Sequence, residues 1–428
     1  MLIYKRNKLL MLAIILITIP VNLLAQNIQN KDLVYDENIK TVLFYPQGNQ
    51  LSDPVITLNS DERLMLEFDD MSDQSFNFRY TVIHCDRNWN NSDLDQIEYI
   101  DGNPEGDIDN FEFSLNAIPS YVHYKMIFPN SEMKVKYSGN YILKVYLDSD
   151  DDENVIITRR FFVVEPKVTV HTEIPYYSSN LDYTRKKQQV NLKIITPDLF
   201  NFQADERFNV FIRQNGRWDN MVRNLKATSV LSNQLDYNYP DGIVFDGGNQ
   251  FRNFDMKSFY YQSMYIRRIM SDANGYKVIL HTDYSKAKKQ YEKVADIHGR
   301  KLIKARNDQE TSIEGEYAWV DFTLKVPEFE NADVYIIGQL NDWLMNENNR
   351  MEYDPRTQSY KKSVFLKQGY YDYMYSVVPK GKTVGDITLV EGDWWDTLNE
   401  YKVYVYYSNM MPEYDRLVGY HEFLSHYE

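Results

Sequence analysis

Cysteine is almost absent from this chain of 428 residues, in which Cys85 is the only one. A single cysteine cannot form an internal disulfide, so the fold must be stabilised by its hydrophobic core. A chain of this length buries roughly three-quarters of its unfolded surface, usually in two or three domains. Small scaffolds held together by disulfides are therefore excluded.

Long apolar runs are scarce as well, and the clearest one lies at the start of the chain. Lys5, Arg6 and Lys8 precede the apolar run LLMLAIILITI, and the small residue Ala25 follows it. This order is typical of an export signal. The run has about 11 residues, whereas a helix needs roughly 20 to span a bilayer. We expect residues 1–25 to be a signal peptide and the mature protein to act outside the cytoplasm.

Positive charge is in short supply. The 62 Asp and Glu residues outnumber the 47 Lys and Arg residues, which gives a net charge of −15. Cleavage of the signal peptide would remove three of these cations, so the net charge of the mature chain would be −18. Such a chain is repelled by phosphates and by anionic lipid surfaces, so nucleic acid is a poor partner. We interpret the short basic run at 185–187 as a solvated loop.

The local motifs of common enzymes are also missing. The sequence has no G-x-S-x-G, no Gly-rich phosphate loop and no H-E-x-x-H, and its seven histidines are scattered. We therefore expect no catalytic residues and no cofactor. The many carboxylates leave one alternative open, an exported glycoside hydrolase, because its two catalytic carboxylates need no local motif.

The stretch NFRYTVIHCDRNWNNSDLD places His84 beside Cys85. If residues 76–85 form a strand, these two side chains point to opposite faces of a sheet. They cannot then converge on one metal ion or form a nucleophile pair. We interpret Cys85 as a core residue, and the segment after it as a loop whose backbone is fixed by Trp89.

An acidic run at 148–153 has the composition of a calcium loop but not its spacing. In an EF-hand register that starts at Asp148, Gly is required at the sixth position and Glu at the twelfth. Glu153 and Arg159 occupy those positions. We interpret the run as a charged hairpin tip and expect no metal site.

Alternation of apolar and polar residues is the dominant pattern of the chain. Leu64, Leu66 and Phe68 share one face of a predicted strand, and similar runs recur between Gly- and Asp-rich turns. This pattern predicts antiparallel sheets, and the 36 tyrosines suit half-buried sheet surfaces. We predict an all-β protein with two or three β-sandwich-like domains in tandem.

The expected domain boundaries follow turn and linker signals. Pro166 closes a predicted hairpin, and residues 306–316 form a polar link. We therefore expect an N-terminal β-sandwich at 26–165, a second β-domain at 166–305 and a C-terminal β-sandwich at 306–428. The segment 285–299 is ambiguous between a helix and a hairpin.

The C-terminal region resembles a glycogen-binding module, an Ig-like sandwich. The resemblance rests on VYIIGQLNDW at 334–343 and on the following GYYDYMYSVV. In such modules exposed tryptophans stack on sugar rings, which Trp343, Trp394 and Trp395 could do here. The alternative is that these tryptophans pack within the fold or face a partner. An exported carbohydrate-binding protein is thus a second candidate function.

Three stretches together resemble the type IX secretion system plug proteins: YTVIHCDRNWNNSDLDQIEYIDG, PYYSSNLDYTRKKQQVNLKI and DGGNQFRNFDMKS. The resemblance implies a periplasmic protein, peripheral to the inner face of the outer membrane and not inserted in it. Its implied partner is the giant translocon β-barrel of that system. The protein would seal the barrel's pore, without catalysis, when no cargo is engaged.

The affinity of a protein interface is concentrated in a few aromatic anchors. We expect such anchors in the loops of this chain. The candidate partner-binding residues are Tyr176, Tyr177, Phe245, Trp394 and Trp395.

Overall fold

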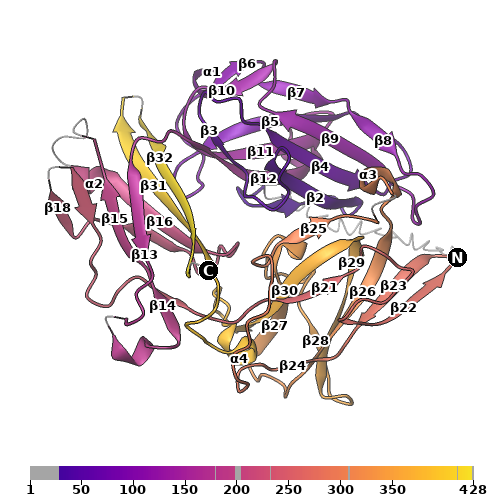
Figure 1. Ribbon diagram of the computed structural model, residues 1–428. Helices are drawn as coiled ribbons and strands as arrows, with labels where there is room; N and C mark the ends of the chain where they lie inside the picture. Colours follow the sequence, from indigo (N-terminus) through magenta and orange to yellow (C-terminus); the bar gives the residue numbers. More distant parts are fainter. Residues whose placement is uncertain are drawn as a thin grey trace, which may run out of the picture.

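The computed structural model of the protein describes residues 28–178, 180–197, 204–231, 233–306, 309–411 and 413–426. The expected signal peptide lies outside these ranges. Strands dominate the described residues and form three β-sandwiches that pack against one another (Figure 1). The predicted all-β fold class is therefore confirmed. Within the described ranges, no helix has the length and apolar character needed to cross a membrane.

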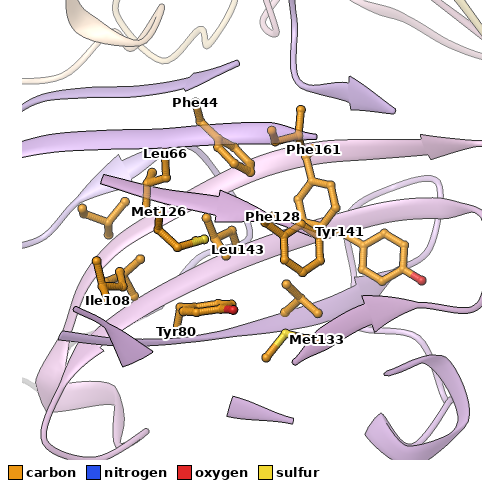
Figure 2. Close-up of a cluster of buried hydrophobic side chains, with 14 of the residues drawn as sticks. Phe44, Leu66, Tyr80, Ile108, Met126, Phe128, Met133, Tyr141, Leu143 and Phe161 are labelled. Atoms are coloured by element: carbon orange, nitrogen blue, oxygen red, sulfur yellow. The ribbon is translucent and has the colours of Figure 1, made fainter. Parts of the chain in front are cut away.

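The first sandwich encloses a large apolar core between two sheets, ordered β1-β12-β11-β5-β7 (with β3 beside β12) and β2-β4-β9-β8. Phe161 of one sheet packs against Phe44 and Phe128 of the other, with ring centroids 5.8 and 5.3 Å apart (Figure 2). Its elements are β1 (Leu33–Val34), β2 (Ile39–Pro46), β3 (Val55–Thr57), β4 (Leu64–Asp70), β5 (Phe78–Cys85), α1 (Gln96–Tyr99), β6 (Ile100–Gly102), β7 (Glu105–Ile108), β8 (Phe111–Phe113), β9 (Val122–Phe128), β10 (Met133–Val135), β11 (Gly139–Leu147), the 3-10 turn Asp152–Asn154 and β12 (Val155–Val164).

The second sandwich combines two distant parts of the chain. Its sheets are ordered β13-β15-β19-β18 and β17-β16-β31-β32, and β14 and β20 form a separate pair. Strand β31 pairs with β16 from Tyr407 opposite Phe208 to Tyr401 opposite Gln214. Its elements are β13 (Thr169–Glu173), the 3-10 turn Leu181–Tyr183, β14 (Lys187–Gln189), β15 (Asn191–Ile195), α2 (Ala204–Arg207), β16 (Phe208–Gln214), β17 (Val222–Leu225), β18 (Ser229–Leu231), β19 (Gln234–Asp236), β20 (Val244–Asp246), β31 (Glu400–Met410) and β32 (Glu413–Leu424).

The third sandwich is organised around the long strand β30, which pairs with β21, β25 and β27. The opposing sheet is ordered β22-β23-β26-β29-β28, with β24 beside β26. The elements of this sandwich are β21 (Arg252–Asp255), β22 (Ile266–Asp272), β23 (Gly275–Leu280), β24 (Asp283–Tyr284), β25 (Lys301–Ile303), α3 (Thr311–Glu314), β26 (Tyr317–Lys325), β27 (Ala332–Ile337), the 3-10 turn Gln339–Asn341, β28 (Glu352–Asp354), β29 (Ser359–Lys367), β30 (Gly369–Pro379) and α4 (Thr388–Glu391).

The expected linker at 306–316 does not coincide with a division between sheets. Strands on both sides of it pair with each other, because β16 pairs with β31 and β21 pairs with β30. Consecutive strands are neighbours only about two-thirds of the time, so a boundary inferred from local turns misses such pairings. The other expected boundary, after residue 165, falls in the connection between β12 and β13.

The ambiguous segment 285–299 takes neither expected form. Residues 285–297 run without helix or strand, and a turn follows at His298 and Gly299, with φ angles of 54° and 79°. Hydrogen bonds to other loops fix this path, such as that from Tyr291 Oη to the carbonyl of Asp396 at 2.9 Å. Tertiary contacts therefore override the local helical pattern.

Candidate functional site: aromatic surfaces on a charge-linked frame

Strand β5 places His84 and Cys85 on opposite faces, as the alternation predicted. His84 is buried against Tyr141, with ring centroids 4.9 Å apart, and its Nδ1 lies 2.9 Å from Ser92 Oγ. Burial lowers the pKa of His84 to about 4. Cys85 is buried in a separate apolar cluster, and burial raises the pKa of its thiol to about 12. Neither group is suited to proton transfer or nucleophilic attack near neutral pH.

The loop after Cys85 serves as an interface between sandwiches. Trp89 is buried between Phe162 of its own sandwich and Trp218 of the second. The guanidinium of Arg160 lies over both indoles, 4.5 Å from the ring of Trp89 and 4.3 Å from that of Trp218. The segment that follows His84 and Cys85 thus holds two sandwiches together.

The acidic run at 148–153 lies at the tip of the β11–β12 hairpin, as predicted. Its side chains bond within the hairpin: Lys144 Nζ lies 2.8 Å from Asp150 Oδ1, and Ser149 Oγ donates to Asp151 Oδ2 at 2.8 Å. Among the residues that the structure describes, no three His, Cys, Asp or Glu side chains are grouped to hold a metal ion.

A buried cluster of charged side chains lies where the three sandwiches meet. Arg300 of the third sandwich binds Glu400 of the second through two N–O contacts of 2.7 and 2.9 Å. Asp53 of the first sandwich lies 3.1 Å from Lys402 Nζ and also binds Arg213. Burial alone would raise the pKa of both carboxyls. The surrounding cations nevertheless hold the pKa of Asp53 below its ordinary value, and that of Glu400 well below it. The cluster therefore stays charged at neutral pH.

Further polar contacts join the sandwiches in pairs. Lys367 of the third sandwich binds Asp69 of the first at 2.7 Å, and both side chains are almost completely buried. Arg87 of the first sandwich binds Asp415 of the second, also at 2.7 Å. Buried ion pairs are costly to break because one charge is then left without a partner.

Trp343 joins the second and third sandwiches by close packing. Its indole lies against both Gly216 and Gly299. A Cβ atom built at Gly216 would lie 2.1 Å from Trp343 Nε1, and one at Gly299 would lie 2.3 Å from its Cη2. Only glycine permits so close an approach. Polar and apolar contacts thus favour one rigid frame over three independently moving domains.

Three of the five expected anchors come together beside β14 and form what we call the Tyr176 surface: Tyr176, Tyr177 and Trp395. The ring of Tyr176 lies 4.8 Å from that of Tyr177 and 4.9 Å from that of Trp395. Trp395 is half-buried and donates from Nε1 to the carbonyl of Pro175 at 3.2 Å. It supports Tyr176, which in turn contacts Tyr177, and the two tyrosines are 49% and 69% exposed. The phenol rings are therefore available to a partner.

The other two expected anchors lie elsewhere. Phe245, on β20, is only 4% exposed and packs on Tyr401 with ring centroids 5.3 Å apart. It belongs to the core of the second sandwich, which corrects the expectation of an exposed anchor. Trp394 is half-buried, and its ring lies 6.3 Å from that of Tyr291.

The sequence interpretation missed a more exposed set of aromatic side chains in the loop between β21 and β22, the 260–265 loop. Tyr260, Tyr261, Met264 and Tyr265 are 77%, 66%, 78% and 38% exposed. The density of large side chains in FYYQSMY was a visible signal, because soluble surfaces seldom gather so many.

A smaller apolar group lies on the edge strand β8 and the segment after it. Phe111, Phe113, Leu115 and Ile118 are each partly exposed there. Strand β8 pairs with β9 on one side and ends its sheet on the other. The alternation signal did not identify this edge because it does not distinguish edge strands from central ones.

Comparisons with known proteins give one family match. A family described as "Type 9 secretion system plug protein 1st domain" matches residues 39–165, the part of the chain that runs from β2 to just past β12. No curated protein matches the chain in sequence.

Two solved structures give very different likenesses. The crystal structure of a hypothetical protein from Parabacteroides merdae ATCC 43184 is similar over 93% of this chain and 100% of its own, with 33% identity and a TM-score of 0.89. The C-terminal domain of the Streptococcus pyogenes antigen I/II-family protein AspA aligns over 90% of this chain and 98% of its own, with 9% identity and a TM-score of 0.18. The second likeness is too weak to carry an argument. The first extends over all three sandwiches.

Proposed function

This chain belongs to the type 9 secretion system plug protein family, and on that premise we propose that it closes the pore of that system's outer-membrane translocon barrel. The protein binds the periplasmic end of the barrel and blocks it while no cargo is engaged. It acts by shape and adhesion, without catalysing a reaction. The observation that carries this proposal is the family match over residues 39–165.

The packing of the sandwiches supports a blocking role. A protein that blocks a pore must keep its shape. The buried charge cluster around Arg300 and Glu400 helps it to do so, because it opposes separation of the three sandwiches. A specific protein interface buries about 1,600 Å² in total. Three packed sandwiches offer ample surface for such a contact.

The Tyr176 surface supports an adhesive role. Tyr176 and Tyr177 are exposed, yet Tyr176 is braced by Trp395, so it loses little conformational entropy when it is buried by a partner. Tyrosine and tryptophan are enriched among the residues that dominate interface energies. We propose that this surface contacts the barrel.

The packing of Trp343 and Trp395 argues against the alternative of carbohydrate binding. A sugar ring stacks on an open indole face, but Trp343 packs against two glycines, and Trp395 lies beside Tyr176 and His426. A pull-down on starch and related glucans tests this directly. Retention that is lost in a Trp395→Ala variant would revive the alternative.

The plug proposal is tested by purification and by permeability. Affinity purification of the tagged protein from cell envelopes should recover a very large outer-membrane β-barrel protein. Deletion of the gene should make the outer membrane leaky to a bulky antibiotic, and the wild-type gene should restore the barrier. An unchanged barrier, together with purification that brings no such barrel, would contradict the proposal.

A further inference from the structure

The 260–265 loop is fixed at both ends although its middle is exposed. Phe259 is buried and stacks on Tyr276 with ring centroids 4.3 Å apart, and Ile266 is buried at the start of β22. Within the loop, Ser263 Oγ donates to the carbonyl of Asp255 at 2.6 Å. The exposed tyrosines and Met264 are thus presented by a defined backbone.

The exposed side chains of this loop have an amphipathic character. Tyrosine carries a large apolar ring with a polar end, and it is enriched where hydrocarbon meets water at membrane surfaces. Met264 adds a flexible apolar side chain that is 78% exposed. In water alone, four such side chains within six residues leave an unfavourable apolar patch.

Within the loop segment the charged residues have one sign, although Asp255 and Asp272 flank the segment and Glu316 lies beside Tyr276. Residues 256–271 contain Lys257, Arg267 and Arg268 but no Asp or Glu. The pairing register shifts between Ile266 and Arg268, and both arginines are exposed there.

The remaining cations near the loop are engaged within the protein. The guanidinium of Arg306 lies 4.8 Å from the ring centroid of Tyr260, where it supports that ring. Lys257 forms an ion pair with Asp255 at 3.0 Å, so it contributes little net charge. Arg267 and Arg268 are therefore the cations that matter for a partner of this loop.

The Tyr176 surface differs in this respect. Its exposed charged neighbours along the chain are of both signs: Glu173 and Asp182 are exposed, as are Arg185 and Lys186. Mixed charge suits a protein partner with its own pattern of charges, whereas a single positive sign suits a uniformly negative surface.

We propose that the 260–265 loop is a membrane-surface contact that binds anionic phospholipid. Tyr260, Tyr261 and Met264 enter the headgroup layer, and Arg267 and Arg268 bind phosphate groups. The contact is peripheral and does not span the bilayer. Only the choice of leaflet, the inner leaflet of the outer membrane around the barrel, rests on the proposed plug function.

The net negative charge of the chain does not prevent this contact. At physiological salt the screening length is about 8 Å, so acidic groups farther from the surface are largely screened. Each basic side chain close to an anionic membrane raises affinity about fivefold. Two arginines and three large side chains give a weak, reversible contact.

The position of the loop leaves the Tyr176 surface free. Strand β22, which follows the loop, lies at the right edge of the molecule in Figure 1, and β14 lies at the lower left. A membrane contact at one end and a protein contact at the other can therefore form together. The two contacts together would fix the orientation of the protein beneath the barrel.

Vesicle co-sedimentation of the purified mature protein tests the proposal. We expect binding to vesicles of phosphatidylethanolamine with about 30% phosphatidylglycerol, and binding about tenfold or more weaker on phosphatidylcholine vesicles or in about 0.5 M NaCl. Combined Tyr260→Ser, Tyr261→Ser and Met264→Ser substitutions should reduce binding about tenfold or more, and so should Arg267→Ser with Arg268→Ser. The matched control, Tyr176→Ser with Tyr177→Ser, should bind like the wild type.

Two results would overturn the proposal: no binding of the wild-type protein to the anionic vesicles, or equal losses in the loop variants and in the control. If the wild type did not bind vesicles and the loop variants failed to bind the barrel partner, the loop would be a protein contact instead. All substituted side chains are exposed, so unchanged thermal unfolding should accompany each variant. Because the vesicles contain no barrel, failure of the plug function would leave this test unaffected.

Discussion

Arg300 and Glu400 form a bidentate ion pair between two sandwiches, with N–O distances of 2.9 and 2.7 Å. The two residues are far apart in the sequence and are both buried. Lys402 binds the same carboxylate, and Asp53 adds a carboxylate from the remaining sandwich. The three sandwiches are thus joined by charges that have little access to solvent.

Removing one member of this cluster should be strongly destabilising. Arg300→Ala leaves Glu400 buried with one cation fewer, which costs about 3–5 kcal/mol of unfolding free energy. Denaturant unfolding measures the loss. The control is Arg350→Ala, which removes an exposed ion pair with Glu347 and should change stability little. Equal effects of the two substitutions would show that the buried cluster does not hold the sandwiches together.

Glu422, at the rim of the cluster, should make stability depend on pH. Burial and the neighbouring Glu400 raise its pKa from 4.5 to about 7, although Lys402 opposes the shift. The folded state then holds a proton that the unfolded state releases, so stability falls as pH rises from about 4.5 to 7. Because the side chain is 40% exposed, the loss is about 1 kcal/mol rather than the full shift.

Glu422→Gln removes this titration. Relative to the wild type, the variant should gain about 1 kcal/mol of unfolding free energy between about pH 5 and pH 8. Denaturant unfolding at several pH values gives the difference. A constant difference across that range would mean that Glu422 does not titrate as the structure requires.

The close packing of Trp343 predicts a coupled pair of substitutions. Gly216→Ala places a methyl group within the van der Waals radius of the indole and should cost about 1–3 kcal/mol. Trp343→Phe alone loses packing, but it frees the space that the added methyl group needs. The double variant should therefore be less destabilised than the sum of the single variants. Strict additivity in denaturant unfolding would rule out the contact.

Local sequence pattern determines which face of a strand is buried, but not which strands pair. Alternation assigns Leu64, Leu66 and Phe68 to one face, and all three are fully buried. The pairing of β31 with β16 brings together segments almost two hundred residues apart, and no turn signal records it. The order of strands depends on packing between whole sheets, which a single sequence does not display.

The same limit applies to the aromatic surfaces. Tyr176 and Tyr177 lie in a polar loop, which predicts their exposure, and both are exposed. The position of Trp395 beside them depends on how the chain returns from the third sandwich to the second. The expectation for Phe245 was wrong because β20 has only three residues, too few for alternation to indicate a face.

Cys85 should be unreactive in the folded protein. Its thiol is fully buried, and burial raises the pKa to about 12, so almost no thiolate is present near neutral pH. We expect no reaction with an aromatic disulfide reagent within minutes under native conditions, and one equivalent of reaction after denaturation. A Ser271→Cys variant, with its thiol on exposed β22, should react at once. Rapid native labelling of the wild type would contradict the packing around β5.

Two aromatic substitutions should separate adhesion from folding. Combined Tyr176→Ser and Tyr177→Ser remove exposed rings, so recovery of the barrel partner should fall about tenfold or more while thermal unfolding stays unchanged. Phe245→Ala removes a buried ring from the core of the second sandwich and should cost about 3–5 kcal/mol of stability instead. Side-by-side purification and calorimetry distinguish the two effects. If the double variant recovers as much barrel partner as the wild type, the two exposed rings do not contribute to binding. The Tyr176 surface would then not be part of the barrel interface.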